Sequence, residues 1–126
     1  MEVSDVIRLI IHFPSPRMGH KGDYFSVNLV FEPDKVIYKK IRLGGPTEQY
    51  PDVLVERELD EAGKEDYALL IDLAVKSPAK PRRPRVYDMS PRYAEVFDTK
   101  GEVKINTVDS TLFWDLARRY REALMK

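Results

Sequence analysis

The stretch "DYFSVNLVFEPDKVIYKKIRL", Asp23 to Leu43, predicts two antiparallel β-strands joined by a tight turn. Its first half alternates between large apolar side chains and polar or tyrosine side chains, which is the pattern of a strand buried on one face. Pro33 and Asp34 are turn formers, and the apolar run "KVIYKKIRL" returns as the partner strand. The inward residues of the first strand are Phe25, Val27, Leu29 and Phe31.

The register of this hairpin is predicted from the rule that facing residues share one side of the sheet. A three-residue turn, Pro33 to Lys35, pairs Glu32 with Val36. The residues that this register turns inward on the second strand are Ile37, Ile41 and Leu43. Those that it turns outward are Tyr24, Asn28, Tyr38, Lys40 and Arg42. The hairpin is therefore expected to expose an aromatic and basic surface.

Two further segments predict strands, and a third is ambiguous. "DVIRLIIHF", Asp5 to Phe13, is a short β-branched run closed by prolines, and "VLVEREL", Val53 to Leu59, has a polar outer side. In "YALLIDLAV", Tyr67 to Val75, the large residues alternate as in a strand. The same residues could also form a buried helix with the acidic pair Glu65 and Asp66 at its start. We expect a strand, with the helix as the alternative.

The C-terminal part of the chain predicts a hairpin followed by a helix. In "DTKG", Asp98 begins and Gly101 ends a type I turn with a left-handed final residue. Asp109 or Ser110 then caps a helix over about 110–125. The inner arc of this helix contains Leu112, Phe113, Leu116, Ala117, Tyr120, Ala123 and Leu124. We therefore expect one α+β domain over 1–126, with an antiparallel sheet, meander or sandwich-like, and the C-terminal α-helix packed on it.

The composition of the chain excludes several kinds of functional site and several classes of protein. The 126 residues contain no cysteine, which excludes disulfides, thiolate catalysis and cysteine-ligated metals. The chain has no run of eighteen apolar residues and no signal-peptide pattern, so we expect a cytoplasmic protein outside the membrane. Charged residues make up 33% of the chain, and Asn28, Gln49 and Asn106 are the only side-chain amides, a balance typical of thermophilic proteins.

The charges are polarised along the chain. Residues 48–72 are strongly acidic, whereas 76–92 are basic. Prolines within about 77–91 predict a long extended loop, which presents Lys80, Arg82, Arg83 and Arg85. Together with Tyr38, Lys40 and Arg42 of the hairpin, these residues are the candidates for binding nucleic acid through its phosphates. The alternative is that the basic loop lies along the protein's own acidic region.

The far side of the last helix suggests a second surface. Trp114 and Met125 fall outside the inner arc, between Arg118 and Arg121, and such residue types anchor protein interfaces. We therefore expect a homo-oligomer, a dimer, or another protein partner. The alternatives are that Trp114 stacks against its own arginines or caps a wider core.

No catalytic, cofactor or metal-binding residues are predicted. His12 and His20 have no ligand spacing, "RLGGP" lacks the rest of a phosphate loop, and the carboxylates of "VERELDEAGKED" are expected around an exposed turn at Gly63. An enzyme that uses these carboxylates is therefore the least favoured class.

Over its whole length, and in the segments "SPRMGHKGDYF" and "KPRRPRVYDMSPRY" in particular, the sequence resembles those of the small uncharacterised proteins encoded by viruses of hyperthermophilic archaea. The resemblance implies a compact domain, often dimeric, in virion structure, nucleic-acid handling or host control, located in the host cytoplasm or the virion. It assigns no residue a role. We expect a non-catalytic binding protein for nucleic acid; the alternative is a structural or protein-interaction protein, virion-associated or self-associating.

Overall fold

The computed structural model describes residues 1–13, 24–44, 52–77 and 92–125. In chain order the elements are a 3-10 helix (Val3–Asp5), β1 (Val6–Phe13), β2 (Tyr24–Glu32), β3 (Lys35–Gly44), β4 (Val53–Glu58), α1 (Glu61–Lys76), β5 (Tyr93–Asp98), β6 (Val103–Asn106) and α2 (Thr111–Met125). The expected α+β class is confirmed. None of the described helices is long and apolar enough to cross a membrane.

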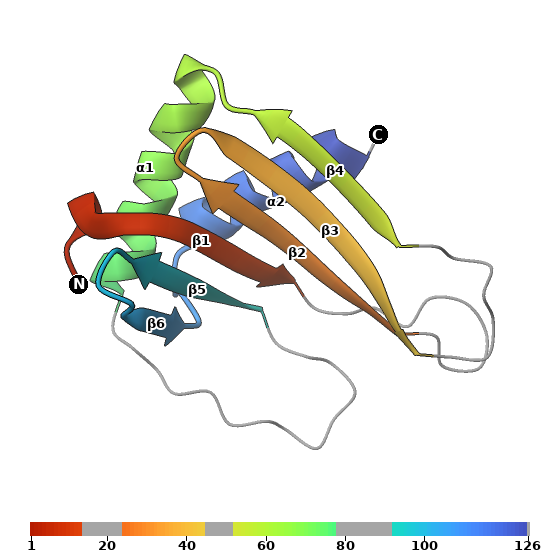
Figure 1. Ribbon diagram of the computed structural model, residues 1–126, viewed down its shortest axis with the longest axis horizontal. Coiled ribbons are helices and arrows are strands. Elements are labelled where there is room, and N and C mark those ends of the chain that lie inside the picture. Colours follow the sequence, from red (N-terminus) through yellow and green to blue (C-terminus); the bar gives the residue numbers. More distant parts are fainter. Residues whose placement is uncertain (14–23, 45–51, 78–91, 126) are drawn as a thin grey trace.

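The six strands form one antiparallel sheet in the order β4-β3-β2-β1-β5-β6, so β1 to β4 make a meander. Figure 1 shows α1 and α2 behind this sheet, and no second sheet is formed by the residues that the structure describes. We name the side toward the helices the covered face and the opposite side the open face.

The core lies between the covered face and the two helices. Leu9 and Ile11 of β1 and Leu29 and Phe31 of β2 are completely buried there. The ring of Phe31 stacks on Tyr67 of α1, with ring centroids 6.0 Å apart. The aromatic core thus ties the central strands to a helix, and burial of this kind is the main stabilising contribution to a fold.

The register predicted for the β2–β3 hairpin is wrong by one residue. The turn has two residues, Pro33 and Asp34, so Phe31 pairs with Val36 and Leu29 with Tyr38. Since a shift by one residue exchanges the two faces of a strand, Val36 and Tyr38 are buried in the core. Ile37 and Ile41, which were expected inward, lie on the open face. Both sides of β3 carry apolar residues, so the hydrophobic pattern did not distinguish the two registers.

The strand expected over Tyr67–Val75 is also wrong, because these residues belong to α1. The Asp60 carboxylate caps this helix by accepting a hydrogen bond from the Gly63 backbone N–H at 2.7 Å. The buried residues, at helical spacing, are Gly63, Tyr67, Leu70, Ile71 and Ala74. The turn expected at Gly63 is therefore the first part of a helix, where a Cβ would lie 3.0 Å from the side chain of Leu59.

The C-terminal predictions that rested on local chemistry are confirmed. Gly101 has a φ of 81°, and the Asp98 carboxylate accepts hydrogen bonds from the backbone N–H groups of Lys100 and Glu102. Ser110 caps α2, because its hydroxyl accepts a hydrogen bond from the Phe113 N–H at 3.2 Å. Two residues of the predicted inner arc, Leu112 and Ala123, are exposed instead.

Candidate functional site

Two residues of the aromatic and basic surface predicted for the hairpin, Tyr38 and Lys40, do not lie on its open side. Tyr38 is only 3% exposed, and burial raises the pKa of its hydroxyl while the nearby charge of Arg121 opposes that increase. Lys40 pairs with Val27, so it lies on the covered side of β3. The Arg42 backbone belongs to β3, but its side chain lies outside the described residues, as do the loop candidates Lys80, Arg82, Arg83 and Arg85.

Trp114 is not the exposed anchor that the sequence predicted. It is 5% exposed, its ring meets those of Phe13 and Phe113 edge-on at 6.1 and 5.0 Å, and its indole N–H donates to the Val108 carbonyl at 2.7 Å. The alternative of a wider core is therefore correct. Met125, by contrast, is exposed as expected.

Around Trp114 the fold assembles an arginine–aromatic cluster, which we define as Phe13, Arg92, Trp114, Arg118 and Arg121. The guanidinium of Arg92 lies 4.8 Å from the centre of the Trp114 ring, and that of Arg121 lies 4.7 Å from the centre of the Phe13 ring. Together with Asp115, the cluster lines a cavity of about 170 Å³. Residues from β1, from α2 and from the position just before β5 thus meet at one place.

The cluster carries more positive than negative charge. Asp115, the one carboxylate among the described residues that line its cavity, lies 3.6 Å from Arg118. Among the described residues, Arg92 and Arg121 form no ion pair, and the buried Nε of Arg121 has no hydrogen-bond partner. Guanidinium groups that are held by aromatic rings and form no ion pair within the described structure are suited to receive the oxygens of a phosphate or carboxylate.

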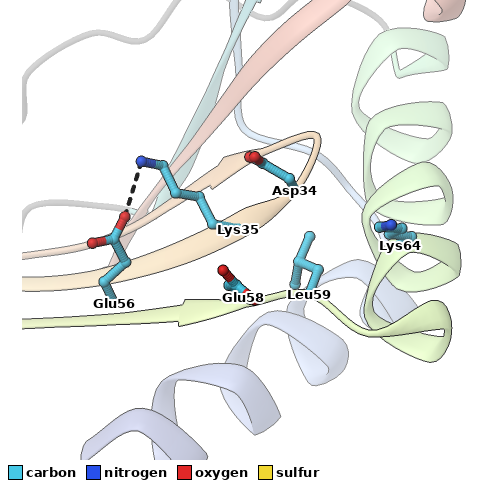
Figure 2. A pocket seen from close by; sticks show the side chains of 6 residues that line it. All are labelled: Asp34, Lys35, Glu56, Glu58, Leu59 and Lys64. Atoms are coloured by element: carbon cyan, nitrogen blue, oxygen red, sulfur yellow. Dashed lines mark ion pairs between the residues drawn. The ribbon is translucent and has the colours of Figure 1, made fainter.

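Figure 2 shows a second cavity, beside the β2–β3 turn. Its volume is about 600 Å³, and the residues that line it are Asp34, Lys35, Glu56, Glu58, Leu59 and Lys64. Lys35 points to Glu56, with 2.9 Å between the ammonium and the carboxylate, and this hydrogen bond raises the pKa of Lys35. The carboxylates here are exposed and both signs of charge are present, so the apolar cleft that acid–base catalysis requires is not formed by these residues.

A third cavity, of about 370 Å³, lies between the two helices. At this cavity the Tyr120 hydroxyl donates a hydrogen bond to the Asp66 carboxylate of α1. Burial and the neighbouring Asp66 raise the pKa of Tyr120 well above its usual range. We interpret this contact as a structural link between α1 and α2, because a tyrosine held neutral by a carboxylate is a poor general base at neutral pH.

His12 has close partners on the open face. Its Nε2 contacts the Glu95 carboxylate, and its ring stacks on Tyr93 with centroids 4.2 Å apart. Across the part of the chain that the structure describes, no group of three or more His, Cys, Asp or Glu residues is arranged to hold a metal ion.

The comparisons with known proteins leave the cluster as the main guide to function. No protein-family model, curated protein or solved structure matches this chain. Sequence reasoning found Trp114, Arg118 and Arg121 but missed Phe13 and Arg92, because only the folded sheet brings them beside α2. The available signal was the place of Arg92 at the end of the basic stretch, directly before a predicted strand.

Proposed function

We propose that this protein is a non-catalytic binding protein that contacts the phosphate backbone of nucleic acid through the arginine–aromatic cluster. The observation that supports this proposal is the convergence of Arg92, Arg118 and Arg121 on one cavity, where Asp115 is the single acidic residue among the described lining residues. Each guanidinium offers several N–H donors in a plane, the geometry that matches phosphate oxygens.

The sequence next to the cluster has the same chemistry. Arg92 directly follows the segment 78–91, which contains Lys80, Arg82, Arg83 and Arg85. In this proposal those four residues bind further phosphates of the same strand, so that the cluster is one end of a longer basic track. Each phosphate that is neutralised releases a counterion, and affinity therefore falls steeply with salt.

The dimensions of the cluster favour a phosphate group over a stacked base. Its cavity of about 170 Å³ is smaller than the roughly 300–1,000 Å³ of common ligand pockets. Trp114 is already buried beneath Arg92, which leaves no open ring for a base to stack on. We therefore expect binding with little sequence preference, because phosphate contacts position a protein on nucleic acid without reading bases.

The test is fluorescence anisotropy with labelled single- and double-stranded oligonucleotides at about 50 and 200 mM salt. The cluster variant is Arg92→Ser with Arg118→Ser and Arg121→Ser; the matched control changes Arg57, Lys64 and Arg119, which are exposed outside the cluster, to Ser. If the three arginines each contact a phosphate, their loss lowers the slope of log affinity against log salt by about 2 to 3. The control keeps most of the affinity.

A third variant, Arg82→Ser with Arg83→Ser and Arg85→Ser, tests the adjoining basic stretch. We expect weaker binding and a flatter salt slope with an unchanged melting temperature. Two results contradict the proposed function: a wild-type protein that binds neither oligonucleotide at low salt, or a control variant that loses as much affinity as the cluster variant.

A second candidate function is a structural or protein-interaction role, in the virion or the host cell if the resemblance to proteins of archaeal viruses reflects the origin of the chain. The observation that favours it is the apolar character of the open face, where Leu54, Val103 and Ile105 are 68, 46 and 48% exposed. Capture of a protein partner that is lost on changing these residues distinguishes it from nucleic-acid binding.

A further inference from the structure

The open face carries a row of apolar side chains across its centre. Hydrogen-bonded neighbours place Ile10 beside Val30, and Val30 beside Ile37. In full, this central row runs Ile105, Glu95, Ile10, Val30, Ile37 and Glu56 from β6 to β4. No helix of the described structure lies on this side of the sheet, which faces the reader in Figure 1.

Such a row is unusual for a face in water. An antiparallel sheet that is solvated on one side normally alternates apolar and polar residues, with the polar ones outside. At the centre of the row Val30 is only 7% exposed and Ile10 and Ile37 are half-buried, whereas Ile105 at its edge and the neighbouring Val103 of β6 are 48 and 46% exposed. Exposed β-branched side chains on a sheet promote association unless they are covered.

Two pairs of opposite charges on the open face neutralise each other, while Lys39 and Glu58 on the same face form no ion pair with a described residue. Arg8 lies 3.6 Å from Glu32, and Lys35 lies 2.9 Å from Glu56. Because both signs are present and neutralise each other, the face does not attract a strongly charged partner such as nucleic acid. Paired charges also leave fewer uncompensated groups when water is removed from an interface.

The two central strands present complementary residues opposite each other. Arg8 of β1 is next to Glu32 of β2, Ile10 is next to Val30, and His12 is next to Asn28. Consider a two-fold axis that runs between these strands and parallel to them. It sets each residue of β1 against the copy of its neighbour on β2, so that Arg8 faces a glutamate and Ile10 faces a valine.

We propose that the open face is the interface of a homodimer, in which a second copy of this chain packs face to face about that axis. Packed sheets lie about 10 Å apart, and an axis parallel to β1 and β2 keeps the central strands of the two copies aligned with each other. The interface is isologous, since each chain contributes the same surface.

The size of the face sets the expected strength of the dimer. Six strands spaced about 4.8 Å and three rows of side chains spaced about 6.8 Å give a flat footprint of roughly 600 Å² per chain. Specific interfaces bury about 800 Å² per partner. Side chains that project from the sheet make the buried area larger than the flat footprint. We therefore expect a dimer that dissociates on dilution, in contrast to an obligate one.

The experiment is sedimentation velocity on the whole chain between about 1 and 300 µM. The central variant is Ile10→Lys, and the edge variant is Ile105→Lys, whose side chain is 48% exposed and so contributes little to the monomer. The matched control is Leu112→Lys, 54% exposed on α2. We expect the dissociation constant to rise at least tenfold for Ile10→Lys, severalfold for Ile105→Lys, and not for the control.

Exchanging the charges of Arg8 and Glu32 tests the proposed two-fold symmetry of the dimer. Arg8→Glu alone places glutamates against each other and weakens the dimer, whereas adding Glu32→Arg in the same chain restores both pairings. The cluster variant that tests nucleic-acid binding dimerises like the wild type, so the two proposals fail separately. A wild type that stays monomeric at about 300 µM overturns the homodimer, and so does a dimer that Ile105→Lys and the charge exchange leave unchanged. If Ile10→Lys does not fold, the edge variant alone decides.

Discussion

The two faces of the sheet differ in what lies against them much more than in their composition. On β1, Leu9 and Ile11 are completely buried under the helices, while Ile10 between them is only partly buried on the open face. On β3, Val36 is completely buried and Ile37 is not. The comparison shows that neighbouring apolar residues of one strand can serve two purposes. Those on the covered face stabilise the fold. On the open face Val30 is already buried in the monomer, and we infer that its less buried neighbours Ile10 and Ile37 stabilise a dimer.

The largest loss of stability is expected from a substitution of Trp114, a buried residue in the helix layer that packs on the covered face. Trp114→Ala removes a buried ring and the hydrogen bond of its indole to Val108. Truncation of a buried tryptophan costs about 3–5 kcal/mol in the free energy of unfolding. Urea denaturation followed by circular dichroism measures it, since the variant has no tryptophan fluorescence. Leu112→Ala, two residues earlier in α2 and exposed, is the control and changes stability by less than about 1 kcal/mol.

A pH titration tests the covered side without creating a cavity. Burial raises the pKa of Tyr67 to about 12 from the ordinary value of 10.0. Its contribution is fully present below pH 10 and is lost as the pH rises toward 12, because the unfolded chain releases this proton first. Tyr67→Phe should lessen the alkaline fall in the free energy of unfolding. Equal falls between pH 10 and 12 in both proteins would contradict this burial of the hydroxyl.

The smallest change in the stability of the monomer is expected from a substitution on the open face. Ile105→Thr keeps a β-branched residue suited to a strand but removes exposed apolar surface. At about 1 µM, where the proposed dimer is dissociated, thermal denaturation should show a change within about 0.5 kcal/mol. A loss of several kcal/mol would mean that part of the same chain covers Ile105, and the contrast between the two faces would disappear.

The same contrast explains which parts of the fold were predictable. The "DTKG" turn and the Ser110 cap follow from local backbone chemistry, and both were correct. The register of β3 depended on identifying the core side, and Ile37 and Ile41 made the open side look like core. In α1 the alternation of large residues from Tyr67 to Val75 coincided with helical spacing, and the cap at Asp60 settles the choice.

The candidate site was only partly predictable for a related reason. A helical wheel assigns α2 one buried arc, but Trp114 is buried against Phe13 and the Val108 carbonyl at the side of that arc. Arg118 and Arg121 were found because they share the helix with Trp114. Arg92 reaches the same cavity from another part of the chain, and this convergence depends on the strand order, which the sequence pattern did not specify.

The most direct test of the account compares two adjacent residues of β1, Leu9→Ala and Ile10→Ala, in the same two measurements. Urea denaturation at about 1 µM gives the stability of the monomer, and sedimentation gives the dissociation constant of the dimer. We predict that Leu9→Ala costs about 2–5 kcal/mol of stability and leaves the dissociation constant unchanged where the protein is folded. Ile10→Ala should cost less than half as much stability and raise the dissociation constant at least tenfold. If Ile10→Ala leaves dimerisation unchanged, or costs as much stability as Leu9→Ala, the two faces do not have the separate roles assigned to them.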